Sequence, residues 1–338
     1  MSYHPAELFE VLDSGKIKCT ACSRYCVLSD GQKGFCGVRI NDSGTLVLSA
    51  YGNPMAIQVD PIEKKPVLHA LPNSTILSIG TNGCNYACKY CQNWDLSQTR
   101  ESGNSNYSPE MIVELALKYN TRGIAFTYNE PTIFVEYAMD IARIAKKKGL
   151  RTIFVTNGSE SEEAVHFIDN MLDFATIDFK GNGAVDFYRR FISMPTSEGI
   201  YDTIDRMMKA GIHVEITDLV VPEVGDSLRE ERNMLSRIIN IAGYEIPISF
   251  LRFHPDYKMN NLSVTPVETL IEHRNLAASL GMKFVYIGNV PGSGYEDTIC
   301  PGCGNVVAKR NGFRTYDIHI DREGRCAYCG YDLHFIMN

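Results

Sequence analysis

The sequence predicts an α/β protein, a partial (β/α)6 barrel that carries a small four-cysteine metal lobe at each end. Three observations support this prediction. Short β-rich runs alternate with longer helical patterns from Thr75 onward, which is typical of parallel βα architecture. Six or seven such units occupy a stretch that is too short for a closed eight-fold barrel of about 250 residues. Eleven cysteines fall into three groups, two of which lie outside the predicted barrel.

The barrel strands are expected to be short and mostly apolar. They are predicted at 75–80, 123–128, 151–156, 174–179, 213–220 and 246–253, with a further candidate at 283–287. Ser108 before Pro109 has the residue types of a helix N-cap and a first helical residue. Lysines before Gly149 complement a helix C-terminus. An open side would let a large substrate reach a buried cofactor.

The flanking segments are expected to fold as separate small lobes. Antiparallel strands are predicted at 46–50 and 56–59. The predicted division is an N-terminal four-cysteine lobe with a β-hairpin (1–70), the barrel (71–292) and a C-terminal rubredoxin-like or zinc-ribbon four-cysteine lobe (293–338).

Composition and charge narrow the classes of function. The formal net charge of −7 argues against nucleic acid as the main partner. No apolar stretch approaches the roughly 20 residues that span a bilayer, and residues 1–10 lack the layout of a signal peptide. We therefore expect a cytoplasmic protein that does not bind a membrane. Cysteine groups of four, three and four suit metal sites better than disulfides in a reducing cytosol.

The most informative segment is a C-x3-C-x2-C loop directly after the first predicted barrel strand, formed by Cys84, Cys88 and Cys91. A cubane iron–sulfur cluster is normally held by four thiolates. Three cysteines would leave one iron open to a chelating ligand. The alternative interpretations of the loop are three unligated cysteines or three ligands of a zinc site. With Tyr90 before the last cysteine, the loop resembles the signature of the radical S-adenosylmethionine (SAM) superfamily. In that superfamily the amino and carboxylate groups of SAM occupy the open iron of a [4Fe–4S] cluster.

Polar residues after the next strands extend the predicted site, because functional groups of βα barrels gather where strands end. Asn129 and Glu130 lie where radical SAM enzymes often carry a Gly-Gly-Glu-Pro segment. Glu130 is expected to accept a charge-assisted hydrogen bond from the SAM ammonium group. Thr156 and Asn157 suit the SAM carboxylate or ribose, and an Asn-Gly turn is the alternative. We predict that these four residues and Tyr90 bind the cofactor.

Three later residues are predicted to be catalytic and to face a cation or the substrate. Asp178 and Lys180 share one face if the fourth strand continues, and a structural ion pair is the alternative. His254 follows the sixth strand and could orient a substrate or relay a proton, or could be a hydrogen-bonded histidine under a loop. Asp178 and His254 are also expected to lie near the cofactor.

Two further resemblances refine this prediction. Residues 75–292 resemble pyruvate formate-lyase activating enzymes, whose Asp-Leu-Lys segment and late histidine correspond to 178–180 and His254. Those enzymes abstract hydrogen from a glycine of a partner enzyme, but Val155 and Thr217 replace an aspartate and an arginine of theirs. The N-terminal cysteines, 60–66 and 127–131 resemble the radical SAM component of the AmmeMemoRadiSam system. This resemblance implies Memo-like and AMMECR1-like proteins as partners.

The two outer cysteine groups are predicted metal sites. The C-terminal group has two C-x2-C-G knuckles, which suit a tetrathiolate site for structural zinc or for rubredoxin-like iron; it comprises Cys300, Cys303, Cys326 and Cys329. The N-terminal group suits a mononuclear zinc or iron site first and an auxiliary iron–sulfur cluster second; it comprises Cys19, Cys22, Cys26 and Cys36. Both lobes could also be platforms for a partner protein.

These observations together predict a radical SAM enzyme. An electron donor such as ferredoxin or flavodoxin would reduce the cluster, SAM would be cleaved, and the 5′-deoxyadenosyl radical would take hydrogen from a protein or a small molecule. The main alternative is a multi-centre iron–sulfur or rubredoxin-like electron carrier or sensor that does not cleave SAM. An RNA-binding protein is the third interpretation, but the chain lacks a basic and aromatic stripe.

Overall fold

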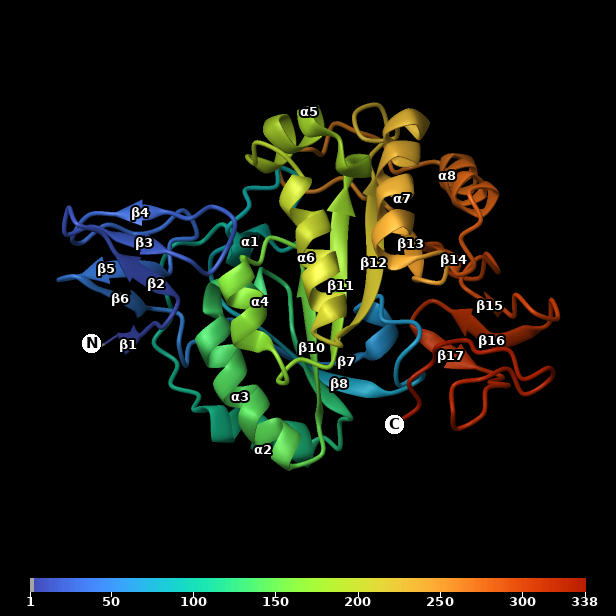
Figure 1. Cartoon of the computed structure of the whole chain (residues 1–338), viewed down its shortest axis with the longest axis horizontal. Helices are drawn as coiled ribbons and strands as arrows, with labels where there is room; N and C mark the ends of the chain where they lie inside the picture. Colours follow the sequence, from blue (N-terminus) through green and yellow to red (C-terminus); the bar gives the residue numbers. More distant parts are fainter. Residues whose placement is uncertain (1–2) are drawn as a thin grey trace.

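The computed structural model describes residues 3–338 and arranges them around one eight-stranded sheet (Figure 1). The strand order is β14-β13-β12-β11-β10-β9-β8-β7, so β7 and β14 lie at opposite edges and the sheet is open. Strands β8 to β14 run parallel, and β7 runs antiparallel to β8. The strands are β7 (Ala56–Pro61), β8 (Thr75–Gly80), β9 (Gly123–Phe126), β10 (Arg151–Thr156), β11 (Phe174–Lys180), β12 (His213–Val220), β13 (Ile248–Arg252) and β14 (Val285–Gly288).

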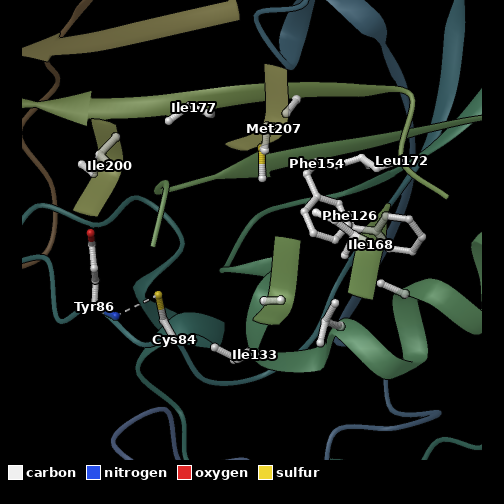
Figure 2. Close-up of a cluster of buried hydrophobic side chains, with 14 of the residues drawn as sticks. Cys84, Tyr86, Phe126, Ile133, Phe154, Ile168, Leu172, Ile177, Ile200 and Met207 are labelled. Atoms are coloured by element: carbon white, nitrogen blue, oxygen red, sulfur yellow. Dashed lines mark hydrogen bonds between the residues drawn. The ribbon is translucent and has the colours of Figure 1, made fainter. Parts of the chain in front are cut away.

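Helices connect the parallel strands and bury their apolar faces against the sheet. The helices are α1 (Trp94–Ser97), α2 (Pro109–Lys118), α3 (Val135–Lys147), α4 (Glu162–Ile168), α5 (Val185–Phe187), α6 (Glu198–Lys209), α7 (Leu228–Ala242) and α8 (Val267–Ser279). Short turns of other helical types are η1 (Ile62–Lys64), η2 (Pro131–Phe134), η3 (Gly181–Gly183) and η4 (Tyr188–Ile192). The Ser108 hydroxyl accepts the N–H of Met111 and caps α2, as its sequence predicts. Figure 2 shows part of the buried core, in which the rings of Phe126 and Phe154 meet edge to face.

The predicted fold class is confirmed. The strands expected at 75–80, 151–156 and 213–220 have those bounds in the structure. Six βα units are followed by a seventh parallel strand, which makes a partial barrel. The antiparallel strands expected at 46–50 and 56–59 are both present but lie in different sheets, since residues 45–48 belong to a sheet of the N-terminal lobe and β7 pairs with β8 along its whole length. An antiparallel β7 covers the edge that β8 would otherwise expose.

Two small lobes flank the sheet on opposite sides (Figure 1). The N-terminal lobe contains two three-stranded sheets, built from β1 (His4–Pro5), β6 (Thr45–Leu48) and β5 (Arg39–Asp42), and from β2 (Phe9–Val11), β3 (Ile17–Cys19) and β4 (Val27–Leu28). The C-terminal lobe contains β15 (Thr298–Ile299), β16 (Val306–Asn311) and β17 (Arg314–Tyr316). The domain boundaries at 70 and 292 stay a prediction.

Buried polar contacts attach both lobes to the barrel. Arg39 pairs with Glu136 of α3 at 2.5 Å, and both side chains are almost fully buried. Arg310 of the C-terminal lobe donates to the carbonyl of Leu68 at 2.8 Å. The backbone of Ile336 forms hydrogen bonds with the segment 69–71. Within residues 3–338, no helix combines the length and apolar character that crossing a membrane requires.

Candidate functional site

A cavity of about 450 Å³ lies at the carboxyl ends of the parallel strands. Its walls include every barrel residue that the sequence predicts for the site, although these residues are far apart along the chain. They are Cys84, Cys88, Tyr90, Cys91, Asn129, Glu130, Thr156, Asn157, Asp178, Lys180 and His254. Parallel strands bring their carboxyl ends to one edge of the sheet, which explains why the polar strand ends converge.

The cysteine loop follows β8 and enters the cavity wall. Cys84 and Cys88 are buried and Cys91 is partly exposed. The N–H of Tyr86 donates to the Cys84 sulfur at 3.4 Å (Figure 2), and the Cys91 sulfur lies 3.2 Å from the Ser97 hydroxyl. Burial raises the pKa of the Cys88 thiol to about 12, and the positive charge of nearby Lys180 opposes part of this rise. Thiols in such surroundings ionise when a metal binds them, so this donor set fits a metal cluster.

The side chain of Asn129 holds this loop in place. Its amide nitrogen donates to the Thr81 hydroxyl at 3.0 Å and to the Gly83 carbonyl at 2.9 Å, and its oxygen accepts the N–H of Thr81. A second contact links the loop to β10, because Asn157 donates to Asn85 at 2.8 Å. Asn129 and Asn157 therefore position the cysteine loop through contacts that the sequence pattern did not indicate.

Glu130 is buried and both of its carboxylate oxygens accept hydrogen bonds from the protein. The donors are the N–H of Thr132 at 3.1 Å, the Thr156 hydroxyl at 2.9 Å and the N–H of Asn157 at 2.8 Å. The Thr156 hydroxyl also lies 2.6 Å from the Glu160 carboxylate. Burial raises the pKa of both carboxyl groups, and that of Glu160 to about 7. Glu160 was absent from the predicted site.

Asp178 and Lys180 form the ion pair that the sequence analysis kept as the alternative. Their charged atoms lie 3.1 Å apart, and Asp178 also accepts a hydrogen bond from the Thr217 hydroxyl. Burial opposes the charge of Lys180, but Asp178 and Cys88 raise its pKa. The ammonium group therefore stays charged beside the cysteine loop.

Tyr90 and His254 lie in very different surroundings. Tyr90 is buried against Phe187 and Phe253, and its hydroxyl has no hydrogen-bond partner within the described residues. The side chain of His254 is 66% exposed and pairs with Asp256 at 3.1 Å. His254 thus lies at the solvent side of the cavity wall, and its predicted role in catalysis stays a prediction.

Sequence reasoning missed a second polar group beside the cavity, centred on Asp60 of β7, whose partners line the cavity wall. Asp60 accepts hydrogen bonds from Lys64 and Lys65, each at 2.8 Å, and from the Tyr128 hydroxyl at 2.6 Å. Burial opposes its charge, but these donors hold the pKa of Asp60 well below its usual range. The acidic residue and two lysines between the prolines at 61 and 66, directly after Asp60, were the signal that could have indicated it.

The C-terminal lobe contains a compact group of four cysteines. The sulfurs of Cys300 and Cys329 lie 3.6 Å apart, and those of Cys303 and Cys326 lie 3.8 Å apart. All four sulfurs lie within 4.8 Å of one another, so the group could bind a metal. Tetrahedral zinc or iron with metal–sulfur bonds of about 2.3 Å requires sulfurs at roughly this separation.

Residues 78–235 match the family model of the radical SAM superfamily. The chain contains a radical SAM domain. This domain implies an enzyme that uses SAM and a [4Fe–4S] cluster. This radical SAM protein is also 39% identical to Uncharacterized protein MJ0808 of Methanocaldococcus jannaschii over 98% of this chain and 99% of that protein. The two proteins therefore belong to one family.

Two other similarities cover only part of the radical SAM protein. Biotin synthase of Burkholderia cenocepacia is 27% identical over 191 residues, which span 54% of this chain and about half (55%) of that enzyme. A domain of a pyruvate formate-lyase activating enzyme from Bacteroides vulgatus superposes with a TM-score of 0.42 at 17% identity. That superposition covers 49% of this chain and 99% of the domain.

Proposed function

We propose that the protein cleaves SAM reductively and uses the resulting 5′-deoxyadenosyl radical to take a hydrogen atom from a substrate. The observation that carries this proposal is the position of Cys84, Cys88 and Cys91 in the wall of the cavity that collects the polar strand ends. These cysteines would hold the [4Fe–4S] cluster. When bound, the cluster supplies one electron to the sulfonium group of SAM.

The residues of the chain contribute binding, orientation and exclusion of water. Asn129 and Asn157 fix the cysteine loop relative to β8 and β10. Glu130 aligns the backbone of Asn157, where the carboxylate or ribose of SAM is expected to bind. Tyr90 and its aromatic neighbours form an apolar wall that keeps water from reactive species. Lys180 places a positive charge beside the thiolates, which are anionic when they bind a metal.

The structure supports two descriptions of the substrate, and one labelling experiment separates them. A substrate polypeptide in extended form or a small molecule would fit a cavity of about 450 Å³. We favour an activating-enzyme-like reaction on a partner polypeptide, with a ferredoxin or flavodoxin as donor and Memo-like or AMMECR1-like proteins as partners. Deuterium that passes from a labelled polypeptide into 5′-deoxyadenosine would support this reaction. Deuterium that passes only from labelled small molecules would contradict it.

The decisive experiment measures 5′-deoxyadenosine from anaerobically reconstituted, reduced protein with SAM. The matched control is Cys84→Ala, which removes one cluster ligand. We expect product from the wild type and none from the control. SAM that fails to bind the wild-type cluster, together with no product, would refute the proposal and favour an electron carrier or sensor.

A further inference from the structure

The N-terminal cysteines form a second group of potential ligands beside the cysteine loop. Cys19, Cys22 and Cys36 are buried, Cys26 is partly exposed, and none of the four forms a disulfide. The sulfurs of Cys26 and Cys36 both come within 4 Å of the position that a Cβ on Gly34 would occupy. The N–H of Cys19 donates to the carbonyl of Cys26 at 2.9 Å, so the segments that carry Cys19, Cys26 and Cys36 lie next to one another.

The spacing of these sulfurs differs from that of the C-terminal group. Among residues 3–338, the C-terminal four form the one group of three or more potential ligands whose atoms gather within 4.8 Å. A single tetrahedral zinc or iron ion needs that tight gathering, because its metal–sulfur bonds are about 2.3 Å long. A cubane cluster holds each thiolate on a separate iron and therefore spreads the sulfurs farther apart. The looser N-terminal group suits the cubane.

The N-terminal group also lies against the loop that carries the cysteines of the cavity. A Cβ on Gly83 would stand 2.3 Å from the carbonyl oxygen of Cys36, so the two cysteine segments touch through their backbones. Arg24, two residues after Cys22, donates to the carbonyl of Asn85 at 2.5 Å. Asn85 follows Cys84 in the sequence. In both contacts, each contacting residue is therefore a cysteine ligand or lies one or two positions along the chain from one.

The segment around Cys22 is fixed to the barrel independently of any metal. Ser23 donates its N–H to the carbonyl of Ser159 at 2.8 Å, and Cys22 forms an antiparallel bridge with Glu160. These contacts attach the N-terminal site to the segment that follows β10. A centre held there has a fixed position relative to the cavity, as a route for electrons requires.

We propose that Cys19, Cys22, Cys26 and Cys36 bind a second [4Fe–4S] cluster that passes electrons to the cluster in the cavity. A reduced low-potential carrier of the ferredoxin or flavodoxin class gives one electron to the N-terminal cluster. That cluster then gives one electron to the cavity cluster and returns to its oxidised state, without transfer of an atom. The transfer step depends on the proposed function, whereas the presence of the second cluster does not.

Counts of acid-labile sulfide and metal in the anaerobically reconstituted chain test the second cluster. We expect about eight sulfides in the wild type and about four in Cys84→Ala/Cys88→Ala/Cys91→Ala. The reduced triple variant should give an electron paramagnetic resonance signal that SAM does not change, because all four irons have protein ligands. The control Cys303→Ala/Cys329→Ala should keep the wild-type sulfide count. About four sulfides in the wild type, with one equivalent of zinc beyond that of the C-terminal site, would overturn the proposal. This outcome is decisive even if the triple variant fails to fold.

A second variant tests the electron route. Cys26→Ala/Cys36→Ala should keep about four sulfides and the SAM-dependent signal of the cavity cluster. We expect it to lose 5′-deoxyadenosine formation driven by reduced flavodoxin and to keep formation driven by dithionite. Equal flavodoxin-driven rates in the variant and the wild type would overturn the route. Absence of SAM cleavage in the wild type with eight sulfides present would instead contradict the proposed function alone.

Discussion

Glu130 and Glu160 lie on either side of the Thr156 hydroxyl, and the hydrogen bonds place one proton between them. The hydroxyl can donate to one carboxylate only. Glu130 accepts two backbone N–H groups besides Thr156, whereas one oxygen of Glu160 is buried without a partner. Burial raises the pKa of both carboxyl groups, and repulsion from Glu160 raises that of Glu130 further, so the pair keeps a proton well above the usual pKa of a carboxyl group.

This arrangement makes the stability of the fold depend on pH. Burial raises the pKa of Glu160 from 4.5 to about 7. Between these values the folded protein keeps a proton that the unfolded chain loses, so the free energy of unfolding falls as pH rises. At about 1.4 kcal/mol per pKa unit, the loss across this window is about 3 kcal/mol.

Glu160→Gln should remove this contribution, because an amide donates to Thr156 but does not ionise. We expect the variant to gain about 2 kcal/mol over the wild type when the pH rises from 5 to 7, because part of the contribution is already lost at pH 5 and part remains at pH 7. Anaerobic denaturant unfolding of the metal-loaded proteins at both pH values measures the difference. Glu130→Gln is the matched control, since its amide would face the N–H of Thr132 or Asn157 and cost about 2–4 kcal/mol at both values. Equal pH slopes for Glu160→Gln and the wild type would refute the raised pKa of Glu160.

Three other predictions concern the cavity wall and the C-terminal lobe. Lys65→Met leaves the buried Asp60 with one cation fewer and should lower the free energy of unfolding by about 3 kcal/mol; an unchanged urea midpoint would contradict it. In Gly83→Ala the new Cβ would meet the Cys36 carbonyl, at a position whose φ is +81°. The substitution should lower the free energy of unfolding by about 2–3 kcal/mol and reduce the iron content. Full iron loading would exclude this steric conflict. Cys300→Ala should make residues 293–338 sensitive to limited proteolysis while the barrel stays resistant, because a lobe of this size depends on its metal; simultaneous digestion of the barrel would show that the lobe does not unfold separately.

The sequence predicts those parts of the structure that depend on neighbouring residues. Strand β8 is a mostly apolar run bounded by polar turn residues, so its limits follow from local composition. The ends of parallel strands must converge, so the position of Glu130 beside Asn157 follows from the fold class. The hydrogen bond between Tyr128 and Asp60 joins residues 68 positions apart, and no local pattern indicates it. The pairing of β7 with β8 was not predicted because no local pattern distinguishes the two possible partners of β7. Both β6 and β8 are mostly apolar strands.

The strand number suggests that the open side of the partial barrel exposes the cavity, but part of this side is covered. The C-terminal lobe covers part of the gap between the edge strands, because Arg310 donates to Leu68, and Thr315 donates to Glu63 at 2.6 Å. His69, which follows β7 in the chain, also bonds to Tyr286 of β14 at 2.7 Å. The two edges of the sheet are thus joined directly by this bond and also through the lobe, whose Thr298 hydroxyl lies 3.0 Å from that of Tyr286. Arg310, Gly312 and Phe313 of this lobe line the cavity, so the lobe supplies part of the cavity wall on the side where the sheet is open.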